Sequence, residues 1–250
     1  MSRRDLNRLP RIYLSLPLVV GETVPLDGTA FGHVGRVLRL KPDAALILFD
    51  GLGGTFAATL VEVGKRDARA RVTEALPSEA EPPLRIVLAQ GISRGDRMDY
   101  TLQKAVELGV TAVQPLFTER GGVDLAGERL ARKVQHWRGI IISACEQCGR
   151  SRLPELRRPL ALADWLARPA QRDLRVLLDP TARQGLRELP APIHGLTLLV
   201  GPEGGLGPAE IARAGRGGFT GVRLGPRILR TETAGVAALA AVQTLWGDWN

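Results

Sequence analysis

Cysteine, histidine and aromatic residues are all scarce in this chain. Among its 250 residues are two cysteines, three histidines and 4% aromatic residues. Cys145 and Cys148 stand in a C-x-x-C spacing that would suit a redox pair or half a zinc site, but a zinc site needs four ligands and no two histidines are suitably spaced. Both cysteines also continue an apolar stripe of helical period through residues 130–148. We therefore predict that they pack in a core and that no metal is bound.

Long apolar runs are also missing, although 44% of the residues are hydrophobic and a packed core is expected. The longest apolar stretch, residues 234–246, is interrupted by Gln243 and Thr244 and is too short to cross a bilayer. The basic residues 1–11 are not followed by the apolar segment and cleavage site of a secretory signal. We expect a cytoplasmic protein without a membrane partner.

Basic residues outnumber acidic ones. There are 34 Lys and Arg against 26 Asp and Glu, a net charge of +8, and the sequence pI is near 10.4. Such a charge favours a polyanionic partner, because contacts with phosphates release counterions. Most of the basic residues are arginine, so genomic codon bias is an alternative explanation.

The first part of the chain consists of short extended segments. Gly, Asp and Pro separate them, and a single short helix is expected at residues 32–40. Closely spaced short strands predict a small barrel. Proline and charge exclude regular structure from residues 77–83, so we predict a barrel domain at 1–75, a linker at 76–83 and a second domain at 84–250. The expected strands are 12–16, 19–26, 45–49, 55–63 and 68–73.

Beyond the linker, strands alternate with amphipathic helices. This order predicts an α/β fold with a parallel sheet covered on both faces. Asp96 is the expected N-cap of the first helix. The last helix is apolar nearly all round, so its outer side is covered either by a second subunit in a homodimer or by the same subunit. The expected strands are 84–89, 110–116, 174–179, 196–200 and 221–224, and the expected helices are 96–108, 128–148, 160–167, 208–214 and 232–246.

Three glycine-rich segments are candidates for a ligand-binding loop. Residues 50–54 lack the third spaced glycine and a following helix, so a hairpin turn is expected. Residues 215–218 follow a helix and are typical of a helix end. The third cluster, Gly201-Pro202-Glu203-Gly204-Gly205, lies at the carboxyl end of a buried strand, where open α/β sheets bind ligands. A tight connection from strand to helix is the alternative for this loop.

The chemistry of the third cluster favours a nucleoside without phosphate. It has no Walker lysine, and Glu203 would repel a triphosphate but could accept hydrogen bonds from ribose or face a cation. S-adenosylmethionine has this character. A second loop, residues 224–234, also runs from a strand end to a helix, which Thr231 or Thr233 could cap. Its arginines, Arg227 and Arg230, suit a phosphate or a developing negative charge.

At these residues the chain resembles the SPOUT superfamily and, more closely, the ribosomal RNA small subunit methyltransferase E family. The resemblance covers nearly the whole chain in order. Arg94 stands where the family usually has lysine, and the cysteines stand where it usually has other small residues. The matching segments are His33 through Arg39, Gln103 through Val110, Pro115 through Arg120, Cys145 through Arg150 with Pro154 after it, Leu199 through Gly205, and Leu224 through Ala234.

The resemblance implies a PUA-like barrel, a C-terminal SPOUT domain with a trefoil knot, and an obligate homodimer. It further implies methylation of uridine N3 in 16S ribosomal RNA with S-adenosylmethionine as methyl donor. Arg230, with Arg227, would stabilise the negative charge on the uracil, and Glu232 or bulk hydroxide would be the base. The residues expected at the cofactor are Leu199, Val200, Gly201, Glu203, Gly204, Leu224, Gly225, Ile228 and Leu229.

The resemblance also assigns basic residues to RNA contacts. Because the fold would recognise shape and unstacked bases, we expect the preferred substrate to be RNA in an assembled small ribosomal subunit and not a short oligonucleotide. Solvated surface charge is the alternative for every cluster. Two other functions stay open: an RNA-binding assembly protein without catalysis, and a SPOUT enzyme that methylates ribose 2′-oxygen. The expected RNA contacts are Arg3, Arg4, Arg8 and Arg11, then His33, Arg36 and Arg39, then Arg94, Lys104 and Arg120, and finally Arg150, Arg152, Arg157 and Arg158.

Overall fold

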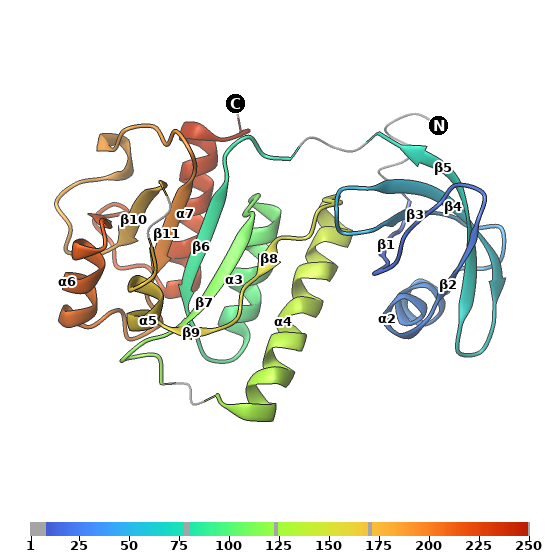
Figure 1. Ribbon diagram of the computed structural model, residues 1–250, viewed down its shortest axis with the longest axis horizontal. Coiled ribbons are helices and arrows are strands. Elements are labelled where there is room, and N and C mark those ends of the chain that lie inside the picture. Colours follow the sequence, from blue (N-terminus) through green and yellow to red (C-terminus); the bar gives the residue numbers. More distant parts are fainter. Residues whose placement is uncertain (1–8, 78–80, 123–124, 170–171, 250) are drawn as a thin grey trace. The chain divides into compact units, whose positions relative to one another are not determined.

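The computed structural model describes residues 9–77, 81–122, 125–169 and 172–249, which form two compact units (Figure 1). The first unit contains the described residues up to Glu81 together with residues 142–153. The second contains residues 82–141 and the described residues from Pro154 onward. The last turns of the long helix α4 (Gly127–Cys148) thus cluster with the N-terminal unit.

The first unit is built on a curled five-stranded sheet. Its strand order is β1-β3-β4-β5-β2; β1 pairs with β3 in parallel and the other pairs are antiparallel. The described pairing runs from β1 to β2 without closing into the expected barrel. The first two strands are shorter than the sequence predicts. The strands are β1 (Arg11–Tyr13), β2 (Thr23–Leu26), β3 (Ala45–Phe49), β4 (Thr55–Val63) and β5 (Ala68–Leu76).

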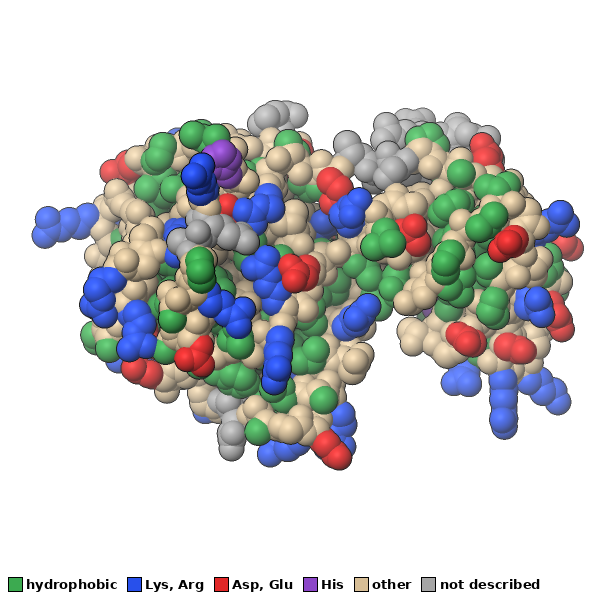
Figure 2. Space-filling view, viewed as in Figure 1, with side chains coloured by type: hydrophobic (Ala, Val, Ile, Leu, Met, Phe, Trp, Pro, Cys, Tyr) green, Lys and Arg blue, Asp and Glu red, His purple; other side chains and the backbone are tan. Residues whose placement is uncertain are grey.

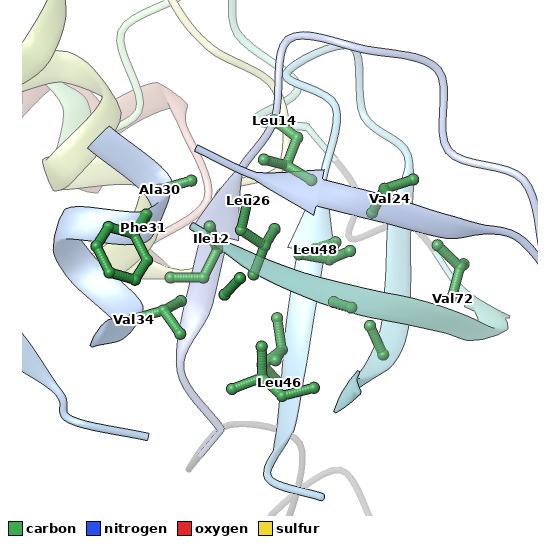
Figure 3. Packing of buried hydrophobic residues seen from close by; sticks show 14 of the residues in the cluster. Ile12, Leu14, Val24, Leu26, Ala30, Phe31, Val34, Leu46, Leu48 and Val72 are labelled. Atoms are coloured by element: carbon green, nitrogen blue, oxygen red, sulfur yellow. The ribbon is translucent and has the colours of Figure 1, made fainter. Parts of the chain in front are cut away.

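Aliphatic side chains fill the core of this unit, as the scarcity of aromatic residues requires (Figure 3). Ile12 and Leu48 point from the sheet toward the short helix α2 (Gly28–Phe31), which contributes Phe31. A π-helical segment, η1 (Gly32–Val37), continues α2 and buries Val34. The prediction of one helix at 32–40 was therefore wrong in its bounds, since the helix starts four residues earlier.

The glycine cluster at 50–54 forms the turn between the antiparallel strands β3 and β4, which confirms the hairpin prediction. Asp50 Oδ1 accepts hydrogen bonds from the backbone N–H groups of Leu52 (2.7 Å) and Gly54 (2.9 Å). The side chain thereby holds the turn, and no helix follows that could receive a phosphate.

The second unit contains the predicted parallel sheet. Its strand order is β12-β10-β11-β6-β7-β8, with β9 also paired to β7, and every recorded pair is parallel. All residues of the central strands β6 and β11 are buried, as expected for strands covered on both faces. The strands are β6 (Ile86–Gly91), β7 (Ala112–Phe117), β8 (Glu155–Leu156), β9 (Leu160–Ala161), β10 (Leu174–Leu178), β11 (Leu196–Val200) and β12 (Thr220–Val222).

Helices cover both faces of this sheet. On one face, α5 (Leu162–Leu166) and α6 (Pro208–Arg216) pack over a cluster that includes Ala89 and Leu199. Gly235 of α7 (Thr231–Trp246) lies next to the neighbouring residues Gln90 and Val200, which point to the opposite face because side chains alternate along a strand. The helix α3 (Asp96–Glu107) packs on α7, and a short 3-10 helix, η2 (Leu186–Glu188), precedes β11.

Both predicted helix caps were wrong. Gly95, with φ +56°, precedes α3, so Asp96 is the first helical residue and acts through its charge in the first turn. Arg230 occupies the N-cap position of α7, because the Thr231 hydroxyl bonds elsewhere and Thr233 lies within the helix. The predicted helix at 160–167 begins at Leu162, since Leu160–Ala161 pairs with β7 as β9.

The cysteines fit a packing role. Cys145 is fully buried and neither thiol is oxidised. Burial raises the pKa of Cys145 to about 12. Within the described ranges, no three His, Cys, Asp or Glu side chains gather as metal ligands. A search of the same residues finds no helix with the length and apolarity that a membrane span requires.

Candidate functional site

A pocket of about 910 Å³ opens in the second unit where β10, β11 and β12 end. Two connections form most of its wall: residues 200–206, which follow β11, and residues 222–231, which lead from β12 into α7. These are the two loops that the sequence singled out. The remaining lining residues include Arg120, Leu177, Leu178, Asp179, Pro180, Thr181, Pro208, Ile211, Ala212 and Ala234.

Glycine at two positions allows the loop 200–206 to lie against the ends of neighbouring strands. A Cβ atom on Gly91, at the end of β6, would lie 2.6 Å from Pro202 Cδ and 2.7 Å from Pro202 N. A Cβ atom on Gly204 would lie 2.9 Å from Arg120 Cβ. Both separations are too short for carbon atoms, so any larger residue would displace the loop.

One side chain joins the two loops. The Thr231 hydroxyl donates a hydrogen bond to the carbonyl oxygen of Gly201 at 2.6 Å and accepts one from Gln90 Nε2 at 3.1 Å. Thr231 is buried and Gln90 is inaccessible to solvent. The start of α7, the end of β11 and the end of β6 are therefore held together by a buried polar network. The sequence reading treated Thr231 as a helix cap and missed this contact.

Glu203 faces α3 as well as the pocket. Its Oε1 accepts hydrogen bonds from the Arg94 backbone N–H and from Arg97 Nη1, each at 2.9 Å. Burial opposes ionisation, but hydrogen bonds from the backbone of Glu203 itself, from Arg94 and from Arg97 outweigh it and lower the pKa of Glu203. The carboxylate stays ionised and fixes the loop to the start of α3.

Glu210 organises the entry to α6 on the other side of the pocket. It is buried, and its oxygens accept the backbone N–H groups of Gly207 at 2.8 Å and Glu119 at 3.0 Å. The first contact caps α6, because it gives a partner to the backbone N–H of its N-cap residue, which has none within the helix. The second ties the residues after β7 to the first turn of α6, so this side of the pocket is preorganised.

Charged side chains stand at the mouth of the pocket. Arg227 and Arg230 line it and are exposed, and Ile228 between them is 87% exposed. Arg120, which the sequence assigned to RNA, also lines the pocket, and its Nη1 donates to the Gly204 carbonyl at 3.4 Å. Asp179 was missed, although its place directly after a buried strand is a signal; its Oδ1 is engaged with Thr181.

The structure brings together nine of the twelve residues predicted for catalysis and cofactor binding. Three do not line the pocket. Leu199 is fully buried in the core under α5 and α6, and Gly225, with φ +70°, forms a turn. Glu232 Oε1 lies 3.8 Å from Arg97 Nε instead. The nine lining residues are Val200, Gly201, Glu203, Gly204, Leu224, Arg227, Ile228, Leu229 and Arg230.

The expected RNA contacts of the first unit divide into exposed and engaged residues. Arg36 and Arg39 are exposed. Arg11 donates to Ser151 Oγ at 2.8 Å, and the largely buried Arg150 pairs with Glu81 at 3.2 Å. His33 Nδ1 lies 3.2 Å from Glu146 Oε2. Arg3, Arg4 and Arg8 lie outside the described residues.

In the second unit, Lys104 forms an ion pair with Glu107, with 2.7 Å between Nζ and Oε1. Arg94 is exposed, and its side chain lies against Gly122. Four arginines line the pocket at the carboxyl ends of the strands, and the rest of the lining is mostly apolar. They are Arg120, Arg223, Arg227 and Arg230. This arrangement suits an uncharged or cationic nucleoside inside and a polyanion outside.

Comparison with known proteins agrees with this chemistry and defines the class as RNA methyltransferase. The family model described as RNA methyltransferase domain matches residues 80–243, and the model described as RNA methyltransferase PUA domain matches residues 26–73. The ribosomal RNA small subunit methyltransferase E of Buchnera aphidicola (subsp. Schizaphis graminum) is 35% identical over 241 residues, which are 96% of this chain and 98% of that protein. The chain belongs to the ribosomal RNA small subunit methyltransferase E family.

Two solved structures are also similar over nearly the whole chain. The Neisseria gonorrhoeae ribosomal RNA small subunit methyltransferase E, bound to S-adenosylmethionine, has a TM-score of 0.93 and 43% identity, with 97% of this chain and 100% of that chain covered. A Legionella pneumophila protein in complex with the same cofactor has a TM-score of 0.93 and 41% identity, with 96% and 99% covered.

Proposed function

We propose that this protein transfers a methyl group from S-adenosylmethionine to N3 of a uridine in 16S ribosomal RNA. The observation that carries the proposal is the pocket formed by two strand-end loops that Thr231 joins through Gly201. Family membership and the two similar structures that hold the cofactor support the choice of ligand. The choice of uridine N3 depends on the sequence resemblance.

The lining of the pocket fits the proposed cofactor. Leu177, Val200, Leu206, Ile211 and Leu229 provide apolar surface for an adenine ring. Asp179 and Glu203 are carboxylates at its wall that suit ribose hydroxyls and a cationic amino acid portion. The positive charge of the lining comes from arginine, through Arg120, Arg223, Arg227 and Arg230, which suit the RNA and the developing charge of its base. When bound, the cofactor would supply an electrophilic methyl group next to its sulfonium.

Arg230 and Arg227 are the proposed catalytic residues. Uracil N3 becomes a nucleophile when it loses its proton, and the negative charge then spreads over both carbonyl oxygens. An exposed guanidinium at the pocket mouth can donate hydrogen bonds to those oxygens and stabilise the anion. The target base must leave its stack to reach this position.

Glu232 is less suited to act as the base than the sequence suggested. Its carboxylate faces Arg97 and does not line the pocket. We propose that the pair with Arg97 steadies the first turn of α7 and that the N3 proton is lost to solvent hydroxide. The cationic surroundings of the pocket mouth favour this loss because they lower the free energy of the uracil anion.

The proposal extends to the whole assembly. The two joined loops would be the crossing segments of a SPOUT trefoil knot, and the partly exposed side of α7 would be covered by a second subunit of a homodimer. Arg36 and Arg39 of the N-terminal unit would contact RNA of the small ribosomal subunit. The methylation would be a step of ribosome biogenesis in the cytoplasm.

Three measurements test the proposal. Calorimetry tests cofactor binding to the purified protein. Methyl transfer to small-subunit ribosomal RNA is then compared for wild type, Arg230→Ala and the control Arg213→Ala on α6, whose side chain is exposed and does not line the pocket. We expect Arg230→Ala to keep cofactor affinity and to lose about 100-fold or more in turnover, the usual effect of removing one oxyanion donor.

Mass spectrometry of the digested RNA identifies the product. Methylation at uridine N3 supports the proposal, whereas methylation of ribose or of another base contradicts it. Absence of cofactor binding by the folded wild-type protein would leave RNA binding without catalysis as the function.

A further inference from the structure

A second pocket, of about 580 Å³, lies in the same unit at the opposite end of the strands. Its floor is a row of three residues in register on adjacent strands: Arg175, Thr197 and Val87. Two residues further along the strands, the side chains on this face are covered by α5 and α6. Val87 and Thr197 of the row are buried, and Arg175 is partly exposed, so Arg175 is the part of the floor that a ligand can reach. The pocket shares no lining residue with the first one.

Positive charge dominates this second pocket. Its lining contains four arginines and one glutamate. Glu155, which is 64% exposed, pairs with Arg157 at 3.0 Å between Oε2 and Nε. Among the described residues, neither Arg158 nor Arg168 has an acidic side chain within ion-pair distance, and both are exposed at the rim. Figure 2 shows Lys and Arg side chains gathered on this face, over the area where Figure 1 draws α5, β9 and β10.

Arg175 places a charge on the sheet itself, where most side chains are apolar. Its Nη1 donates to the Gly217 carbonyl at 2.6 Å, and its guanidinium lies 5.2 Å from the ring centre of Phe219. Its Nε is buried without a hydrogen-bond partner among the described residues. The buried side chain of Asp173 acts electrostatically on Arg175; it accepts a hydrogen bond from Thr197 Oγ1 at 3.1 Å and pairs with Arg85. The positive charge that stays available to a ligand is therefore that of the rim, where Arg158 and Arg168 are exposed.

We propose that this second pocket binds a phosphodiester group of the substrate RNA, away from the pocket for methyl transfer. The inference depends on the proposed function in that RNA is the substrate. Arginine is suited to the task because its planar donors match two phosphate oxygens at once. The pocket would hold the RNA beside α5, and a phosphate there would add to the binding energy without touching the reacting base.

The test compares two double variants with the same loss of charge. Arg158→Gln with Arg168→Gln removes the rim of the pocket, while Arg213→Gln with Arg216→Gln removes two exposed arginines of α6 that do not line it. Binding of small-subunit ribosomal RNA is measured between 50 and 300 mM salt, a range of roughly the span over which phosphate contacts are lost. We expect the rim variant to bind about 10-fold more weakly and the slope of log K against log salt to fall by about 1 to 2.

Calorimetry with S-adenosylmethionine accompanies each variant. The proposal is supported if only the rim variant loses RNA affinity and both double variants still bind S-adenosylmethionine as the wild type does. If both double variants lose RNA affinity equally, or neither loses any, phosphate binding in the second pocket is overturned. The proposal of methyl transfer is unaffected by either result. If wild type binds RNA normally but never binds the cofactor, the proposed function fails and the pocket is judged on the RNA data alone.

Discussion

Removing the hydroxyl of Thr231 should separate the two loops that form the candidate active site. Thr231→Val keeps the shape of the side chain but loses the hydrogen bond to the Gly201 carbonyl and the one from Gln90. The Gln90 amide still reaches the Gly91 carbonyl at 3.0 Å, whereas the Gly201 carbonyl keeps a single long contact with Gln90, at 3.5 Å. The Gln90 amide therefore loses little, whereas the Gly201 carbonyl is left poorly bonded, and the two lost hydrogen bonds together should cost about 2 kcal/mol.

This cost should appear both in folding and in ligand binding. Chemical denaturation should show the free energy of unfolding reduced by about 2 kcal/mol. Calorimetry should show S-adenosylmethionine binding weakened about 10-fold, which corresponds to about 1.4 kcal/mol for holding the two loops in place without the Thr231 hydroxyl. Thr231→Ser, which keeps the hydroxyl, should restore most of the affinity.

The same helix offers a matched control. The hydroxyl of Thr244 bonds to the Ala240 carbonyl at 2.9 Å and is exposed, so Thr244→Val should change stability by about 0.5 kcal/mol or less. Equal effects of the two valine substitutions would refute the idea that Thr231 holds the loops together. A large loss of stability with unchanged ligand affinity would show that the bond serves the fold alone.

Three further predictions concern the loop after β11 and the buried thiol. Gly91→Ala should lower the free energy of unfolding by about 1–3 kcal/mol, because its Cβ would meet Pro202, and thermal unfolding measures this loss. Glu203→Gln should be less stable than wild type at neutral pH. Because the folded-state pKa of Glu203 is lowered, its contribution is present above the ordinary value of 4.5 and disappears as the pH falls through the folded-state pKa, so denaturation curves of the two proteins should converge in acid. Cys145, whose pKa burial raises to about 12, should resist iodoacetamide at pH ~8 in the folded protein and react in urea, as peptide mass spectrometry would show.

Each of these has a clear contrary result. Wild-type stability for Gly91→Ala would mean that the loop does not press on β6. A stability difference at Glu203 that persists unchanged in acid would mean that its charge is not what matters. Alkylation of Cys145 in the native protein would revive the redox interpretation of the C-x-x-C spacing.

The sequence alone determined the periodic features of the protein. Alternation of short strands and amphipathic helices predicted the parallel sheet, because burial on both faces demands continuous apolar strands such as residues 196–200. Glycine at the carboxyl end of that strand and two arginines after β12 marked the loops of the candidate site. These signals are local, so they can be read from neighbouring residues.

Contacts between distant residues were decided by the tertiary structure. Thr231 bonds to a carbonyl 30 positions away, and Glu203 bonds to residues more than 100 positions away, so neither role has a local signature. Thr231 does not cap α7 because it is the first residue inside the helix, after Arg230 at the N-cap position, and its buried hydroxyl instead bonds to Gly201 and Gln90. The row of Arg175, Thr197 and Val87 likewise exists only because three strands lie in register.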